Sequence, residues 1–122
     1  MSNRKISISK DGKDILDSIS NILEIERPQT VKIALAKGIS ITNGPVQTKS
    51  FHSENKWTLP EGIIKDNDYL LFKHLIINEQ EQSFDDNEIS KQMQFFIEIG
   101  LRELQQIDQH KTSLDDFRIA IL

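Results

Sequence analysis

The stretch Arg4–Ile41, RKISISKDGKDILDSISNILEIERPQTVKIALAKGISI, decides the predicted fold. At its start, Ile6 and Ile8 point to one side of an extended segment, and the polar residues between and around them point to the other. This alternation predicts a short strand. No Asn-Gly turn follows it to form a hairpin. We therefore expect the strand either to join a later strand of the same chain or to pair with the strand of a second copy.

An amphipathic helix is expected to follow, with Ser9 or Asp11 as its N-cap and its end near Ile25. Acidic residues in its first turn complement the helix dipole. Its apolar residues recur at the spacing i, i+1, i+4, i+7, i+8, which places them on one buried face: Ile15, Leu16, Ile19, Ile22 and Leu23.

Pro28 separates this helix from a second one. Proline disfavours helical geometry at the residue before it and suits the first turn of a new helix. The second helix should run from Pro28 to Lys37, with Gly38 as its stop. Ala34 and Gly38 are two small residues one turn apart, which allows another helix to approach closely. Core packing and a dimer contact both account for this pair.

The rest of the chain is predicted to be a loop, residues 42–65, and a helical half, residues 66–122, so that residues 1–122 form a single, mainly α domain. A short strand is expected within residues 46–51, and Trp57, the only tryptophan, should seal the core or else stack on a ligand. The helix expected at 66–79 is so broadly apolar that it should be buried or face another subunit. The longest helix should span 86–109, with Gly100 at a close packing point, and the apolar end 117–122 should dock on the body or on a neighbour.

Composition argues against catalysis. The chain has no cysteine, which excludes thiolate chemistry and fits a reducing cytoplasm. Its three histidines are far apart in sequence, so a metal site is not expected. There is no phosphate-binding glycine-rich loop and no nucleophile motif. No signal peptide and no membrane-spanning run are recognisable. We therefore predict a cytoplasmic protein that is not an enzyme and needs no cofactor.

The net charge of −4 is unevenly distributed. Residues 1–50 hold eight Lys and Arg against five Asp and Glu, a balance of +3, and residues 51–122 hold seven against fourteen, a balance of −7. An acidic chain can still present a local basic face to phosphates. Ordinary scatter of surface charge explains the asymmetry equally well.

A strand followed by two helices in about 40 residues resembles the ribbon–helix–helix DNA-binding family. The resemblance implies that two chains pair their strands antiparallel and insert the ribbon into the major groove. It also implies that the second helix offers the backbone N–H groups at its start to a phosphate. The alternative is that the unit only forms a dimer core. The DNA-contacting residues expected on the first interpretation are Arg4, Lys5, Ser7, Lys10, Lys13, Arg27, Gln29, Thr30 and Lys32.

A longer stretch resembles the family of the DNA sulfur modification protein DndE. The matching pieces are Ile8-Ser9-Lys10, the stripe from Ile15 to Leu23, Lys32-Ile33-Ala34-Leu35 and Gly38-Ile39, followed by 68–72 and 96–101. Lys32 stands where that family prefers arginine, which keeps the charge but loses bidentate geometry.

The second resemblance implies a non-catalytic accessory subunit of a bacterial DNA phosphorothioation system. Such a subunit binds double-stranded DNA, including nicked duplex, mainly through the backbone. It forms a homo-oligomer, a dimer or a tetramer, and works with the other subunits of the system. Two alternatives remain: a ribbon–helix–helix transcriptional regulator or antitoxin, and a protein–protein scaffold that does not contact DNA.

Overall fold

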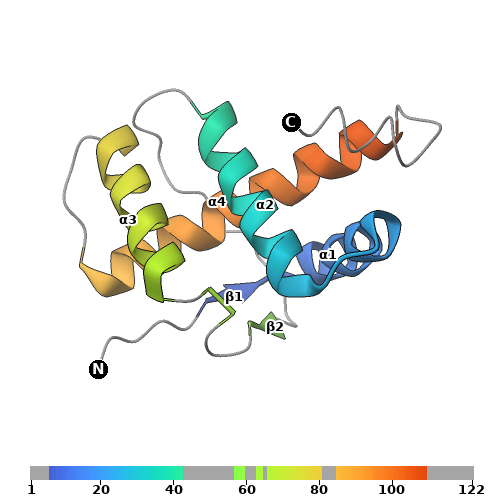
Figure 1. Cartoon of the computed structure of the whole chain (residues 1–122), viewed down its shortest axis with the longest axis horizontal. Coiled ribbons are helices and arrows are strands. Elements are labelled where there is room, and N and C mark those ends of the chain that lie inside the picture. Colours follow the sequence, from blue (N-terminus) through green and yellow to red (C-terminus); the bar gives the residue numbers. More distant parts are fainter. Residues whose placement is uncertain (1–5, 43–56, 60–62, 65, 81–84, 110–122) are drawn as a thin grey trace.

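A computed structural model describes residues 6–42, 57–59, 63–64, 66–80 and 85–109 of the 122-residue chain. Within these residues the fold is mainly helical, as predicted. Four helices, α1 (Lys10–Leu23), α2 (Arg27–Ile41), α3 (Asp66–Gln80) and α4 (Asp86–Gln109), accompany two short strands, β1 (Ser7–Ile8) and β2 (Trp57–Thr58). The long helix α4 extends through the molecule; α2 crosses it, and α3 lies at one end (Figure 1).

The N-terminal strand finds its partner within the same chain. β1 and β2 pair antiparallel, with Ser7 opposite Thr58 and Ile8 opposite Trp57, and the Leu59 amide donates to the carbonyl oxygen of Ile6 over 2.8 Å. Of the two expected arrangements, the structure has the strand joined to a later strand. This edge of β1 therefore needs no second copy. The strand expected within residues 46–51 lies outside the described residues.

Helix α1 begins after Ser9, which is one of the two N-caps that the sequence predicted. The Ser9 hydroxyl accepts a hydrogen bond from the Gly12 amide at 3.0 Å, which satisfies one of the free donors of the first turn. The helix ends at Leu23, two residues before the predicted Ile25. It ends there because Glu24 adopts the left-handed conformation, with φ of 59°, and cannot continue the helix.

Helix α2 continues through Gly38 to Ile41, so the predicted stop at Gly38 is wrong. Gly38 is buried in the helix instead, where a Cβ atom would overlap the carbonyl oxygen of Phe96 on α4. The contact is reciprocal, because a Cβ on Gly100 of α4 would overlap the carbonyl oxygen of Ala34. Each glycine thus lets the other helix's backbone approach. Close packing of α2 on α4 within one chain accounts for the Ala34–Gly38 pair, and the prediction that Gly100 serves close packing is confirmed.

The core is built mainly on α4, and α3 is only half covered. Six apolar side chains of α4 are essentially inaccessible to solvent: Ile89, Met93, Phe96, Ile97, Leu101 and Leu104. On α3, Tyr69, Phe72 and Ile76 are buried, whereas Leu70, Leu71 and Leu75 are 50%, 55% and 42% exposed.

Among the described residues, no helix is long and apolar enough to cross a membrane. The apolar end at 117–122 lies outside them, so its predicted docking stays a prediction.

Candidate nucleic-acid interface

Two of the predicted DNA-contacting residues, Lys13 and Arg27, converge on Trp57. Lys13 comes from the first turn of α1 and Arg27 from the start of α2, while Trp57 lies on β2. The Lys13 ammonium is 5.5 Å from the centroid of the indole ring and the Arg27 guanidinium carbon is 5.8 Å from it, both within the range of cation–π attraction. Pairing of β2 with β1 holds the tryptophan beside the two helix starts. We call Lys13, Arg27 and Trp57 the Trp57 cluster.

Asp17 links the two cations of the Trp57 cluster. Its carboxylate accepts from Lys13 Nζ at 3.0 Å and from Arg27 Nε at 2.7 Å. Partial burial on its own would raise the pKa of Asp17, but the hydrogen bonds from Lys13 and Arg27, together with their charges, outweigh it, so that the pKa lies below its ordinary value. Asp17 therefore stays ionised near neutral pH and leaves the three charged groups with a balance of +1.

The start of α2 does not offer the free backbone donors that the sequence analysis expected. The amides of Gln29 and Thr30 both donate to the carbonyl oxygen of Glu26, at 3.1 and 3.2 Å, and Pro28 has no N–H to give. The Glu26 amide in turn donates to Gln29 Oε1 at 3.4 Å. The donors on which the expected phosphate contact relied are thus engaged within the chain.

Thr30 is the predicted site residue that the structure places least favourably. Its side chain is fully buried; its hydroxyl accepts from Ser20 Oγ at 2.8 Å and donates to the carbonyl oxygen of Glu26 at 3.3 Å. A direct contact between this side chain and DNA would require α1 and α2 to separate. Thr30 thus belongs to the interface between these helices, and its expected contact with DNA stays a prediction.

The other predicted residues are dispersed. Ser7 shares a hydrogen bond with Thr58 across the strand pair, at 3.1 Å. Lys10 is exposed at the first residue of α1, one turn before Lys13. Lys32 is paired with Asp68 of α3 at 3.2 Å, a different carboxylate from the Asp17 that Lys13 and Arg27 share. Arg4 and Lys5 lie outside the described residues.

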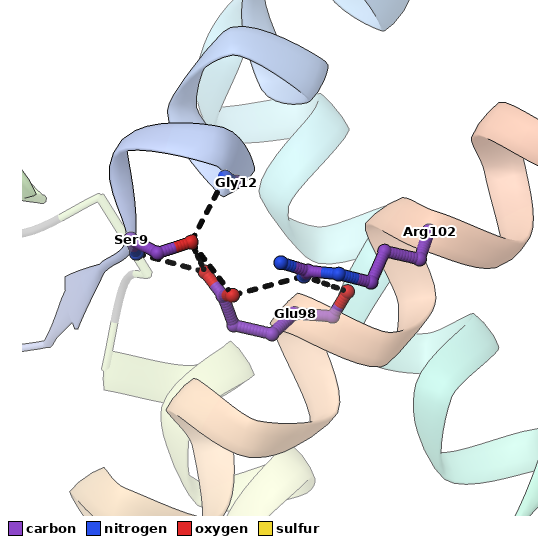
Figure 2. A network of polar contacts seen from close by, with 4 residues as sticks. All are labelled: Ser9, Gly12, Glu98 and Arg102. Atoms are coloured by element: carbon purple, nitrogen blue, oxygen red, sulfur yellow. Dashed lines mark hydrogen bonds and ion pairs between the residues drawn. The ribbon is translucent and has the colours of Figure 1, made fainter. Parts of the chain in front are cut away.

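Sequence reasoning missed a buried carboxylate, Glu98 of α4, which is inaccessible to solvent. Its carboxylate accepts hydrogen bonds from the Ser9 amide, the Ser9 hydroxyl and Arg102 Nη1, each at 2.9 Å, and these partners surround it in Figure 2. Glu98 thereby fixes the junction of β1 and α1 on α4, and Lys13 of the Trp57 cluster follows Ser9 by four residues. A single acidic residue inside the apolar run 95–99, FFIEI, was the available signal, since such a residue is rarely buried without partners.

The remaining features define no reaction centre. Within the described part of the chain, no group of three or more His, Cys, Asp or Glu side chains could hold a metal ion. An open hollow of about 540 Å³ beside Arg102 is lined by side chains of both charges and by amides, and this mixture specifies no ligand class.

Comparison with known proteins adds no assignment, because no family model, no curated protein and no solved structure matches the chain.

Proposed function

We propose that this chain is a non-catalytic, DNA-binding accessory subunit of a bacterial DNA phosphorothioation system that contacts the DNA mainly through the backbone. The system is suggested by the resemblance to the DndE family, and the DNA contact is supported by the Trp57 cluster. Its partners are double-stranded DNA, including nicked duplex, a second copy of the chain and the other subunits of the system.

The observation that carries the DNA contact is the convergence of Lys13 and Arg27 on Trp57. Arg27 is about half exposed and uses Nε for Asp17, and within the described part of the chain its two terminal nitrogens make no hydrogen bond. A guanidinium held in this way can give its terminal N–H groups to a phosphate. Lys10, one helical turn before Lys13, extends the basic surface.

The test is binding of fluorescently labelled duplex, intact and nicked, measured by anisotropy across a salt series. Arg27→Glu combined with Lys13→Glu should weaken binding at least tenfold and flatten the slope of log K against log salt, since each lost phosphate contact removes about 0.9 from that slope. Lys91→Glu together with Lys37→Glu is the matched control, because both lysines lie outside the Trp57 cluster. Emission of Trp57, the only tryptophan, gives a second readout at the site itself.

Equal affinities for the cluster variant and the control variant would contradict the proposal. Binding to one operator sequence alone would favour the ribbon–helix–helix regulator instead. That alternative requires strand pairing between two chains, which would have to use the edge of β1 that β2 does not occupy.

A specific observation favours the scaffold alternative: the exposed leucines of α3 form an apolar surface of the kind that contacts proteins. Absence of any salt-dependent DNA binding would leave the scaffold as the function.

A further inference from the structure

Helix α3 carries a second apolar face opposite the one that it buries. Six exposed residues follow the helical spacing i, i+3, i+4, i+7, i+8, i+11 and form what we call the α3 stripe: Asn67, Leu70, Leu71, His74, Leu75 and Asn78. Its three leucines are about half exposed, and the helix lies at one end of the molecule (Figure 1). Leucines gathered in this way on a helix face are typical of a protein interface.

The charge of the α3 stripe restricts the partner. None of its six residues is Asp, Glu, Lys or Arg, whereas the chain as a whole has a net charge of −4. Two copies of this chain repel each other at long range, so an uncharged face is where they can meet without placing like charges together. A nucleic acid or a strongly charged peptide would find no opposite charge there.

The order of residues in the stripe points to a copy of the same helix. The stripe has nearly the same order in both directions: Asn, Leu, Leu, His, Leu, Asn. If a second α3 packs antiparallel about a two-fold axis between positions 72 and 73, Leu70 lies opposite the partner's Leu75, and Asn67 lies opposite the partner's Asn78. Asparagine amides both donate and accept, so two of them can pair. A two-fold interface requires this self-complementarity.

We propose that the α3 stripe is the interface through which two copies of the chain pair, with their α3 helices antiparallel. This pairing assigns the exposed leucines of α3 to a second copy instead of an unrelated protein. It rests on the second copy of the chain that the proposed function includes, but it uses none of the Trp57 cluster, so loss of pairing and loss of DNA binding are measured separately.

The experiment is light scattering coupled to size exclusion, on the full chain, at concentrations from about 1 to about 100 µM, where interfaces of modest size associate. The wild-type mass should be about twice the 14.1 kDa of the chain. Leu70→Glu combined with Leu75→Glu should halve the measured mass while circular dichroism stays unchanged. Ile41→Glu is the matched control, because Ile41 is 44% exposed but lies on α2, and it should leave the mass unchanged.

A second variant tests the antiparallel register. Leu70→Lys combined with Leu75→Asp places opposite charges across the pairing twice, and it should bind itself at least tenfold more tightly than the double-glutamate variant. If the glutamates disturb folding, serine at the same two positions replaces them. A wild-type tetramer that the stripe variant reduces to a dimer also supports the proposal.

A wild-type monomer over the whole concentration range would overturn the proposal. So would an unchanged mass in the stripe variant, an equal loss with Ile41→Glu, or no recovery with the opposite-charge pair.

Discussion

Replacing Glu98 tests the buried network that joins the start of α1 to α4. In Glu98→Ala, the Ser9 amide loses its acceptor in a site that is inaccessible to solvent, and an unsatisfied buried donor costs about 1–3 kcal/mol. The Ser9 hydroxyl keeps its bond from the Gly12 amide, and Arg102 is exposed enough to turn to water. Removing one partner of a buried charged pair typically costs about 3–5 kcal/mol. Since water can solvate Arg102 after the change, we expect the free energy of unfolding to fall by about 3 kcal/mol, near the lower end of this range.

A more conservative change separates charge from shape. Glu98→Gln keeps an oxygen for the Ser9 amide but removes the charge that faces Arg102, so it should cost about 1–2 kcal/mol. Ser9→Ala removes both the N-cap and the hydroxyl bond to Glu98, and an N-cap alone contributes about 1 kcal/mol. Because the two side chains touch, the Ser9→Ala, Glu98→Gln double mutant should cost less than the two single changes together, by about 1 kcal/mol.

The assay is urea unfolding followed by circular dichroism and by Trp57 emission. Trp57 reports on the junction because it pairs with Ile8, next to Ser9. Glu103→Ala is the control on the same helix, since Glu103 is partly exposed and its loss should stay within about 0.5 kcal/mol. A Glu98→Ala loss below about 1 kcal/mol, or one equal to that of the control, would refute the reasoning that this carboxylate is held by buried partners.

Two further predictions concern helix packing and pH. Gly100→Ala should destabilise the fold by about 2–3 kcal/mol in the same urea assay, because the new methyl group meets the Ala34 carbonyl and the backbone cannot move aside. A gain in stability of about 1 kcal/mol, the helix propensity of alanine over glycine, would instead show that the two helices are farther apart. Asp17→Asn should reduce stability at neutral pH, because the folded pKa of Asp17 lies below its ordinary value. The contribution of the Asp17 carboxylate to stability is therefore fully present above the ordinary aspartate pKa of about 3.9. It is lost as the pH falls through the lower pKa of the folded state. The difference between wild type and Asp17→Asn should therefore fade on acidification, and a difference that stays constant from neutral pH to about pH 2 would contradict the ion pairing.

The helices could be predicted because their signals are local. The apolar spacing of Ile15 to Leu23, the cap at Ser9 and the proline at 28 each act within a few residues of the chain. The end of α2 could not be predicted, because a glycine near the end of a helical pattern usually marks its C-terminus. Gly38 is instead needed for close packing on the backbone of Phe96, which lies far away in the sequence. The partner of β1 was missed for a similar reason, since two residues, Trp57–Thr58, are too few to show alternation.

The candidate site was likewise predicted only in part from the sequence. The basic residues were identified from sequence, and the i, i+4 spacing of Lys13 and Asp17 is visible there. The placement of Arg27 and Trp57 around them was not, because it depends on how α1, α2 and β2 come together. Thr30 shows a second limit of the sequence: a polar residue at a helix start suggests a ligand contact, and only the structure shows that its hydroxyl accepts a hydrogen bond from Ser20 of the neighbouring helix.

If the proposed DNA contact is made, the ion pairs limit how strongly the basic half of the chain can attract DNA. Lys32 is matched by Asp68, and Lys13 and Arg27 share Asp17, so these described cations contribute a balance of +1. A phosphate that binds the terminal N–H groups of Arg27 would then lie near the Asp17 carboxylate, which Lys13 and Arg27 hold at 3.0 and 2.7 Å and which would repel it. Affinity from this surface alone should therefore be modest and strongly dependent on salt, and pairing through α3 would add a second such surface to the same assembly.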